Sequence, residues 1–596
     1  MASSRSRIGW LLVWGVAFCD IGTSVYYVPG ILYGTNGDLA GLFTAITMVA
    51  FIFLCVKYVE ITRRFKDGGG VVRVADAAFG PFWGCLGGQF IMVDYFLTAA
   101  ISATAGAYYV DSIFPLAGWV IPTTLLALFA LGGLNIIGIK ESAVASLVLA
   151  AATFVVDLVL IGTALIAMPS DVVARIPEQL GEIRRLNLMP ALVGYSAAWL
   201  AFSGLESVSQ LSPAMRDFDK TPRWGMAAVA VSVILTAPLL TFLSIASLSP
   251  EIKSTESERF MSELAHLWGG HGLKLAVVLT ASTLLLFAAN TAIIGNYHVQ
   301  LALVNMKFMP EGMAKLSRRF HTPFRAILFS VAVPAALVIF SGGDMAFLGD
   351  LYAFGLLGAF VLSSTGMDWI HLREHKKNVW FYIGLFTSLL VIVAWGTNLV
   401  HKPAATIFGG CVSAIGMAIA YGTRRGWWER LAAKIPRLAP PPPEEGIIPC
   451  KSLKQTLAES PPKLSVLVAS RGADERVYRE AAARAKAKGE EAVWLIYVDE
   501  VPGLFYPPEH EPTPEGLTVL QAGSLIMKSI GVRTELVWSL AHSAGERVAE
   551  AATSLGVDTV VIGATRRGIL WKILRGRFLE DLIQHVPSNI RVAVVN

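Results

Sequence analysis

Long apolar stretches follow one another through the first two thirds of the chain. About twelve of them are long enough to cross the ~30 Å hydrocarbon core of a bilayer as α-helices. Of all 596 residues, 54% are hydrophobic and only 16% are charged, and the mean hydropathy is +0.57. A soluble protein of this size does not bury so much apolar surface, so the chain is predicted to be a mainly α-helical, polytopic membrane protein. The expected spans are 8–33, 38–62, 82–109, 117–137, 142–168, 189–210, 224–248, 272–298, 323–341, 346–368, 378–397 and 402–422.

Lysine and arginine residues predict the orientation of these spans. They gather in the N-terminus and in the loops on one side of the membrane, which marks that side as cytoplasmic. The opposite loops 34–38 and 109–116 contain neither residue. Both termini are therefore expected in the cytoplasm and the protein in the inner (plasma) membrane. The amphipathic stretch 298–322 is expected to form a short helix on the cytoplasmic surface.

The first span carries a carboxylate in its middle. Asp20 is followed by Gly22 and later by Pro29 and Gly30. A carboxylate at mid-membrane depth costs about 3 kcal/mol, and glycine and proline weaken the helix around it. Broken backbone is tolerated in a bilayer only where it is buried in protein or lines a watery cavity. This stretch is predicted to form half of a substrate or ion site, with helix breaks at Gly22 and Gly30.

The sixth span repeats this pattern. It places Ser203 and Gly204 beside a second carboxylate, Glu206. Two interrupted, acid-bearing spans that lie five helices apart are typical of an inverted repeat with a binding site at the midplane. Gly204 is therefore predicted to be a third helix break.

A third carboxylate, Asp94, lies in the third span. Thr98 follows four residues later, so both side chains share one face of a helix. The three acids predict a cation site or a proton relay, whereas the alternative is a structural hydrogen bond between helices. Neutral oxygens can ligate a hard cation or hold helices together. They are Tyr352 in the tenth span and Thr280, Ser282, Thr283, Asn290, Thr291 and Asn296 in the eighth.

The composition changes after the last span. A proline run at 440–443 indicates a stiff linker. The chain is thus divided into a transmembrane transporter domain, 1–425, an amphipathic and proline-rich linker, 426–461, and a cytoplasmic domain, 462–596. In the last part, strands and helices alternate, which predicts a parallel, doubly wound α/β sheet. Strands are expected at 464–469, 492–498, 534–538, 559–563 and 591–595, and helices at 475–488, 518–530, 545–555 and 578–585.

Several function classes are excluded by what the sequence lacks. The net charge of +5 is small for this length and gives no reason to expect nucleic acid. The five cysteines do not have metal-ligand spacing, so no metal site is expected. The chain has no G-x-x-x-x-G-K-[ST] pattern, so it is not expected to be an ATP-driven pump or another enzyme.

The segment 20–27, Asp-Ile-Gly-Thr-Ser-Val-Tyr-Tyr, resembles the GDIGTSPLY signature of potassium uptake permeases of the KUP type. The segments 68–70, 93–98, 203–209, 289–291 and 351–353 are similar to those of the bacterial KimA-type branch. These families belong to the amino acid–polyamine–organocation (APC) superfamily. The resemblance therefore implies a LeuT-like fold of five plus five helices. It also implies secondary active import of potassium by proton symport, through alternating access.

The resemblance also implies roles for individual residues. The acids at Glu206 and Asp20 would couple transport to protons. The positions that match the cation site are Asp20, Tyr27, Asp94, Thr98, Ser203 and Tyr352.

An amino acid permease of the same superfamily is the alternative. The family's Pro-Leu-Tyr is replaced by Val25-Tyr26-Tyr27, and Val28-Pro29-Gly30 looks more like an amino acid permease. An amino acid substrate needs N–H donors for its carboxylate, whereas three acids suit a bare cation. A third hypothesis is a membrane sensor that signals through its cytoplasmic domain.

The C-terminal domain resembles the universal stress protein fold. Relatives that bind ATP use a loop of the form G-x-x-G-x9-G-[ST], which Gly563 and Gly576 fit and which Arg566 and Arg577 depart from. ATP or cyclic di-AMP is the nucleotide that such a loop would bind, through arginine contacts to phosphate. A regulatory or dimerising role is favoured over a nucleotide-dependent one, and a homodimer through this domain is expected.

Overall fold

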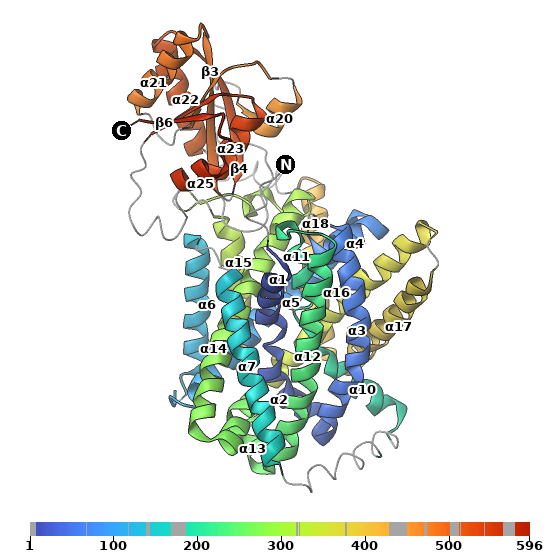
Figure 1. Ribbon diagram of the computed structural model, residues 1–596. Coiled ribbons are helices and arrows are strands. Elements are labelled where there is room, and N and C mark those ends of the chain that lie inside the picture. The colour runs from blue at the N-terminus through green and yellow to red at the C-terminus, as the bar shows by residue number, and fades with distance from the viewer. Residues whose placement is uncertain are drawn as a thin grey trace.

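The structure is a computed structural model in which a bundle of long helices is followed by an α/β domain beyond one end of the bundle (Figure 1). It describes residues 8–595 except for 67, 117, 139–142, 169–180, 182–185, 318, 319, 321, 376, 377, 428–449, 460, 470–473, 501–511, 513, 542 and 564–577. The long helices of the bundle are α3 (Ala40–Arg64), α5 (Pro81–Asp111), α6 (Val120–Ile137), α7 (Ala143–Ala167), α12 (Lys220–Ser247), α14 (Phe260–Asn305), α15 (Phe324–Ser341), α16 (Met345–Arg373), α17 (Val379–His401) and α18 (Pro403–Arg424).

Shorter elements complete the bundle. Two interrupted spans are built from α1 (Trp10–Ile21) with α2 (Ser24–Asn36), and from α10 (Leu188–Ala198), η2 (Trp199–Phe202) and α11 (Ser207–Gln210). The connecting elements are η1 (Gly37–Leu39), α4 (Gly70–Phe79), η3 (Ser212–Ala214), α13 (Pro250–Thr255), η4 (Ser257–Arg259) and η5 (Glu311–Met313).

In the described part of the chain, eleven helical segments are long and apolar enough to cross a membrane. The first runs from Trp10 to Arg64 and contains two predicted spans, 8–33 and 38–62, because η1 joins α2 to α3. The predicted mainly helical, polytopic membrane fold is confirmed. In α14, Gly270 has non-helical backbone angles, so the helix is kinked just before its predicted span, 272–298.

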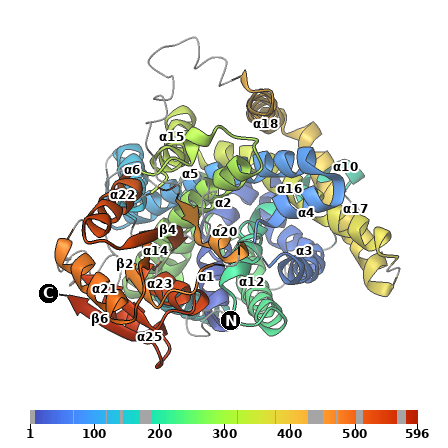
Figure 2. The ribbon, with the colours of Figure 1, turned by 90° about the horizontal axis from the view of Figure 1, so that it is seen from above.

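The central helix of the bundle is α5. Its most apolar 18-residue window is 100% buried, whereas the corresponding windows of α6 and α18 are only 22% buried. A helix that is apolar on all sides is stable where it is enclosed by other helices. In the view along the bundle, α17 and α18 lie at its outside (Figure 2). The central position of α5 places Asp94 in the interior.

The predicted surface helix at 298–322 is wrong. Helix α14 continues to Asn305, and in the described part of the remaining stretch only the short turn η5 follows. The reason is packing: Val299, Leu301 and Val304 are buried in the bundle, so the apolar side of this stretch covers other helices.

The C-terminal domain contains a sheet of six parallel strands in the order β1-β4-β3-β2-β5-β6. Along β3, Val493 and Leu495 point into one hydrophobic core and Trp494 and Ile496 into another, so both faces of the sheet are covered. The predicted doubly wound sheet is confirmed. The strands are β1 (Lys451–Ser452), β2 (Val466–Ala469), β3 (Ala492–Glu500), β4 (Arg533–Ala541), β5 (Thr559–Gly563) and β6 (Arg591–Val595), and the helices are α20 (Leu453–Ala458), α21 (Glu475–Ala487), α22 (Pro514–Ser529), α23 (Ala544–Ser554) and α25 (Phe578–His585).

The sheet begins before the predicted boundary at 462. Strand β1 pairs with β4, and α20 follows it directly. Ser452 and Gln455 form a capping box at the start of α20, with each side chain accepting from the other's backbone N–H. Residues 451–458 therefore belong to this domain and not to the linker, and the Ser-x-x-Gln spacing was the sequence signal for them.

Candidate functional site

Two helix interruptions face each other in the bundle interior. Helix α1 ends at Ile21 and α2 begins at Ser24, so Gly22 and Thr23 separate them. In the other span, the backbone is not helical between Phe202 and Ser207, and Gly204 has φ +95°. Glycine adopts this angle without the strain that another residue would carry.

The interruptions are in direct contact. A Cβ atom added to Gly204 would lie 2.7 Å from the Ile21 backbone nitrogen and 2.8 Å from Asp20 Cγ, so only glycine fits there. The Ser207 hydroxyl donates a hydrogen bond to the Asp20 carboxylate. The Ser24 hydroxyl donates to the Ala201 carbonyl at 2.9 Å. Asp20 is therefore held between the two broken spans.

Helices α5 and α16 form the facing wall. Thr98 Oγ1 donates to the Asp94 carbonyl at 3.0 Å and lies 2.8 Å from the Tyr352 hydroxyl. The Tyr352 hydroxyl in turn contacts the Ser203 hydroxyl. A Cβ atom on Gly355 would lie 2.8 Å from the Asp94 nitrogen, so this glycine allows α16 to approach α5 closely. A chain of hydroxyl groups thus connects the α5–α16 wall to the second interruption.

The carboxylates of this site are buried and carry unused oxygen atoms. Asp94 is fully buried, and neither of its carboxylate oxygens has a hydrogen-bond partner in the described part of the chain. Glu206 is 2% exposed, and its Oε2 also has no such partner. Neither acid, nor Asp20, forms an ion pair with a lysine or arginine that the structure describes. An enclosed group of acids without a basic partner is suited to binding a cation.

The structure brings together all the residues predicted for the cation site. Tyr27 is buried and lies within electrostatic reach of Asp20 and Asp94. Asp94 and Glu206 lie near enough for each to interact with the charge of the other. A cavity of about 20 Å³, lined by Glu206 with Gln210 and His298, adjoins the site. This volume holds about one water molecule.

The helix break predicted at Gly30 is wrong. Helix α2 runs through Gly30 to Asn36. A Cβ atom at this position would lie 1.8 Å from the Ser257 carbonyl oxygen, so the glycine is required because η4 passes close to the helix. The break at Gly22 alone separates α1 from α2.

Two polar residues of the eighth span connect α14 to other helices, and four others bond within their own helix. Asn290 accepts a hydrogen bond from Asn135 at 2.7 Å, and Asn296 donates to the Met92 carbonyl at 3.1 Å. The hydroxyls of Thr280, Ser282, Thr283 and Thr291 donate to carbonyls of their own helix, α14. Of the two roles considered for these residues, the contacts of Asn290 and Asn296 support helix packing.

A fourth buried acid, Asp157, escaped the sequence analysis. The Tyr26 hydroxyl donates to Asp157 Oδ1 at 2.8 Å, and Tyr109 donates to the Tyr26 carbonyl at 2.9 Å. Asp157 Oδ2 is buried and has no hydrogen-bond partner among the described residues. The signal was a single charged residue inside the apolar span 142–168.

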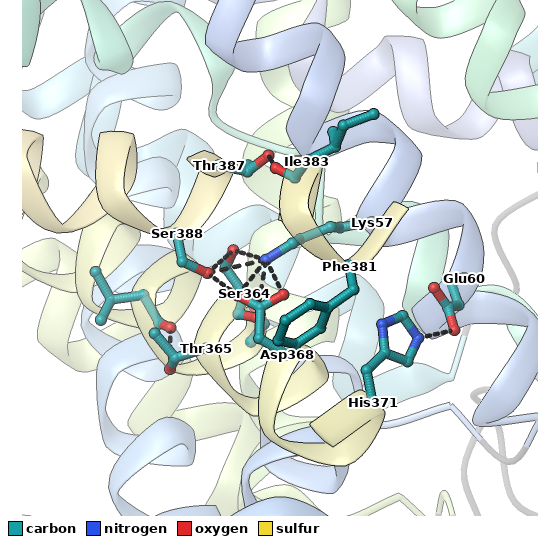
Figure 3. Close-up of polar contacts among 12 residues, drawn as sticks. Lys57, Glu60, Ser364, Thr365, Asp368, His371, Phe381, Ile383, Thr387 and Ser388 are labelled. Carbon is teal, nitrogen blue, oxygen red and sulfur yellow. Dashed lines mark hydrogen bonds and ion pairs between the residues drawn. The ribbon is translucent and has the colours of Figure 1, made fainter. Parts of the chain in front are cut away.

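Sequence analysis also overlooked a buried ion pair outside the site (Figure 3). Lys57 Nζ of α3 lies 2.9 Å from Asp368 Oδ1 of α16, and it also contacts the hydroxyls of Ser364 and Ser388. A Cβ atom on Gly384 would lie 2.6 Å from Asp368, so this glycine makes room for the acid. The signal was a lysine in the apolar span 38–62.

The residues predicted to bind a nucleotide are only partly described. Gly563 ends β5, whereas Arg566, Gly576 and Arg577 lie outside the described residues. The structure therefore gives no geometry for this loop.

Comparisons with known proteins match both parts of the chain. Residues 8–423 match the family described as "Amino acid permease", and residues 463–595 match the "Universal stress protein family". Potassium transporter KimA of Bacillus subtilis (strain 168) is 27% identical over 336 residues, which is 55% of this chain and 55% of that protein. The chain thus spans about half the length of that relative.

Two further relatives differ in the substrate that they are named for. The probable potassium transport system protein Kup of Corynebacterium glutamicum is 23% identical, over 69% of this chain and 67% of its own length. The low-affinity putrescine importer PlaP of Escherichia coli (strain K12) is 20% identical, over 66% of this chain and 89% of its own length.

Proposed function

This chain belongs to the amino acid permease family of membrane transporters, and from that premise we propose that it imports potassium by proton symport. It is a multi-pass membrane protein with a C-terminal universal stress protein domain. The names of the KimA and Kup relatives support potassium as the substrate. We place both termini in the cytoplasm, because the basic loops are on the side of the termini.

The observation that carries the proposal is the charge of the site. Asp20, Asp94 and Glu206 share one buried region and form no ion pair with a described lysine or arginine. Desolvated potassium is stabilised by carboxylate, carbonyl and hydroxyl oxygens. The carboxylate of an amino acid would instead be repelled by the same three acids. The charge therefore favours a cation over an amino acid.

In the proposed site, the potassium ion is bound from two sides. Asp94, Thr98 and Tyr352 offer oxygens from the α5–α16 wall. Asp20, Tyr27 and Ser203 offer oxygens from the two interrupted spans, where the carbonyls freed at a helix break also face a cation. Glu206 and Asp20 would exchange protons, and the small cavity beside Glu206 would provide a water for that exchange.

The conformation described is closed around the site. Asp20 is 4% exposed, Asp94 is not exposed and Tyr352 is 1% exposed. A transporter that works by alternating access passes through such an occluded state. Movement of the interruptions relative to the α5–α16 wall would open the site to either side, and it would break the Ser203–Tyr352 contact that joins them.

An organic diamine is the second candidate substrate, because a relative is named for putrescine import. Buried carboxylates bind ammonium groups as well as metal cations. A hydrogen-bonded hydroxyl chain with a cavity of about 20 Å³ beside it leaves little room for a diamine in this closed state. The geometry therefore favours the smaller cation.

We also propose roles for the C-terminal domain. It would regulate transport and pair two chains into a homodimer, and ATP or cyclic di-AMP would be the ligand of the loop after β5. Gly563 at the end of that strand supports a loop of this kind.

Growth rescue tests the proposal. A bacterium that lacks potassium uptake should grow at low potassium when it expresses the wild-type chain, and Asp94→Asn should fail. Asp350→Asn is the matched control, because Asp350 is an acid of another membrane helix, α16, and is half exposed in a pair with Lys402. Uptake of labelled rubidium, putrescine and amino acids in vesicles identifies the substrate. Putrescine or amino acid uptake without rubidium uptake would overturn the proposal.

A further inference from the structure

A groove of about 910 Å³ opens on the outside of the bundle between α3, α12, α16 and α17. It lies where α3 and α16 end and where α12 and α17 begin, which is the end of the bundle nearest the C-terminal domain (Figure 1). Lys57 and Asp368, the buried ion pair of Figure 3, lie at its base. The groove is separate from the proposed potassium site.

Two walls of the groove change from charged to apolar with depth. On α3, Arg63 lies near the helix end, and Val56 and Ile52 follow deeper on the same face. On α12, Arg223 lies near the helix start, followed by Ala227 and Ala230. These spacings of three, four and seven residues place the side chains of each wall on one helix face. Both walls therefore present positive charge at the mouth and apolar surface inside.

The acids in the groove are already neutralised. Glu60 contacts Arg64 and His371, Asp219 contacts Arg63, and Asp368 contacts Lys57. Two basic side chains at the mouth are not part of these ion pairs. Lys66 and Arg223 are exposed and form no ion pair with a residue that the structure describes, although the Lys66 amine lies 5.1 Å from the centre of the Phe218 ring. The mouth thus carries an excess of positive charge.

Two exposed tryptophans indicate the depth of the groove in the membrane. Trp380 on α17 lines the groove and is 61% exposed, and Trp224 on α12, which follows the lining residue Arg223, is 62% exposed. Exposed tryptophans are typical of the level of the lipid head groups. Ile52 and Val56, further in, are 40% and 42% exposed, as expected of side chains that face acyl chains.

We propose that this groove binds an anionic phospholipid from the leaflet on this side of the membrane. Its phosphate would contact Lys66 and Arg223, and one acyl chain would lie along Val56, Ala227 and Ala230. The basic mouth of the groove matches the anionic head group of such a lipid, and its apolar walls match an acyl chain. Basic pockets between transmembrane helices recognise anionic head groups in this way, whereas a zwitterionic lipid has no net charge to offset that of Lys66 and Arg223.

Native mass spectrometry of the purified full chain tests the proposal, with phosphatidylglycerol and phosphatidylcholine as competing probes. The wild type should retain phosphatidylglycerol in preference. The double variant Lys66→Ala/Arg223→Ala should lose that preference, by about fivefold for each basic residue removed. Lys220→Ala is the matched control, because Lys220 is exposed on the first turn of α12 but does not line the groove. It should bind as the wild type does.

A second variant tests the apolar part and protects against a folding artefact. Ala230→Trp keeps every charge and fills the groove, so it should also lower retention of phosphatidylglycerol. Each variant is accepted only if it elutes as a single species. Equal retention of the two lipids by the wild type would overturn the proposal, and so would retention by the double variant equal to that of Lys220→Ala. The readout does not involve transport, so it does not depend on the proposed substrate.

Discussion

Replacement of Lys57 by methionine should destabilise the membrane domain strongly. The Lys57 and Asp368 side chains are only 9% and 10% exposed, and the lysine amine lies 2.9 Å from the carboxylate. Methionine keeps much of the side-chain length and removes the charge. Asp368 would then remain buried, with the Ser388 hydroxyl still donating a hydrogen bond to it. Removal of one partner from a buried ion pair costs about 3–5 kcal/mol, because an uncompensated charge remains.

Two further variants isolate the cause. In Lys57→Met/Asp368→Leu both charges are absent, so the stability should return close to that of the wild type. Lys402→Met breaks a second ion pair between membrane helices, in which Lys402 Nζ lies 2.8 Å from Asp350 Oδ1. The Asp350 side chain is 46% exposed, and the loss there should be about 0–1 kcal/mol.

The assay is the fraction of detergent-solubilised protein that elutes as a single species after heating, measured over a series of temperatures. The expected order of melting temperatures places Lys57→Met lowest, with the double variant and Lys402→Met near the wild type. A double variant as unstable as Lys57→Met would refute the charge argument, because lost packing would then be the cause. A melting temperature of Lys57→Met equal to that of Lys402→Met would refute the claim that burial matters.

Three other substitutions have defined outcomes. Gly204→Ala should abolish rubidium uptake, because the new Cβ would lie 2.7 Å from the α1 backbone and the positive φ adds about 1–3 kcal/mol of strain. Gly410→Ala is the control and should leave uptake unchanged, because a Cβ at Gly410 would meet no atom within 4 Å. Thr98→Val should raise the KM for rubidium about fivefold or more, because it removes a hydroxyl that contacts Tyr352. Asp157→Ala should lower thermal stability more than Asp157→Asn, which can still accept from Tyr26.

Sequence reasoning succeeded where a local pattern was sufficient. Apolar stretches of membrane length predicted the bundle, and the alternation of strands and helices predicted the parallel sheet. The interruption at Gly22 was predicted because an acid and a glycine lie within one apolar span. The same reasoning failed at Gly30, where a glycine is required because η4 passes close to the helix. A contact between distant segments of this kind leaves no pattern in the local sequence.

Contacts between distant spans could not be predicted in the same way. Lys57 and Asp368 are 311 positions apart, and Tyr26 and Asp157 are 131 apart. Each residue is visible as a charge or hydroxyl in an apolar span, but which one it meets depends on how the helices pack. The surface helix expected at 298–322 failed for the same reason, because its apolar side faces other helices and not the membrane surface.

The proposed site also suggests how potassium and protons could be coupled without a separate proton channel. Desolvation and mutual repulsion oppose three full negative charges in one buried space. In the proposed cycle, a bound cation offsets part of that charge, and protons on Glu206 or Asp20 offset the rest. The contact between Gly204 and Asp20 joins the two interruptions, so the charge on Asp20 acts directly on the elements that must move. Occupancy of the site and movement of the helices are then linked through the same carboxylate.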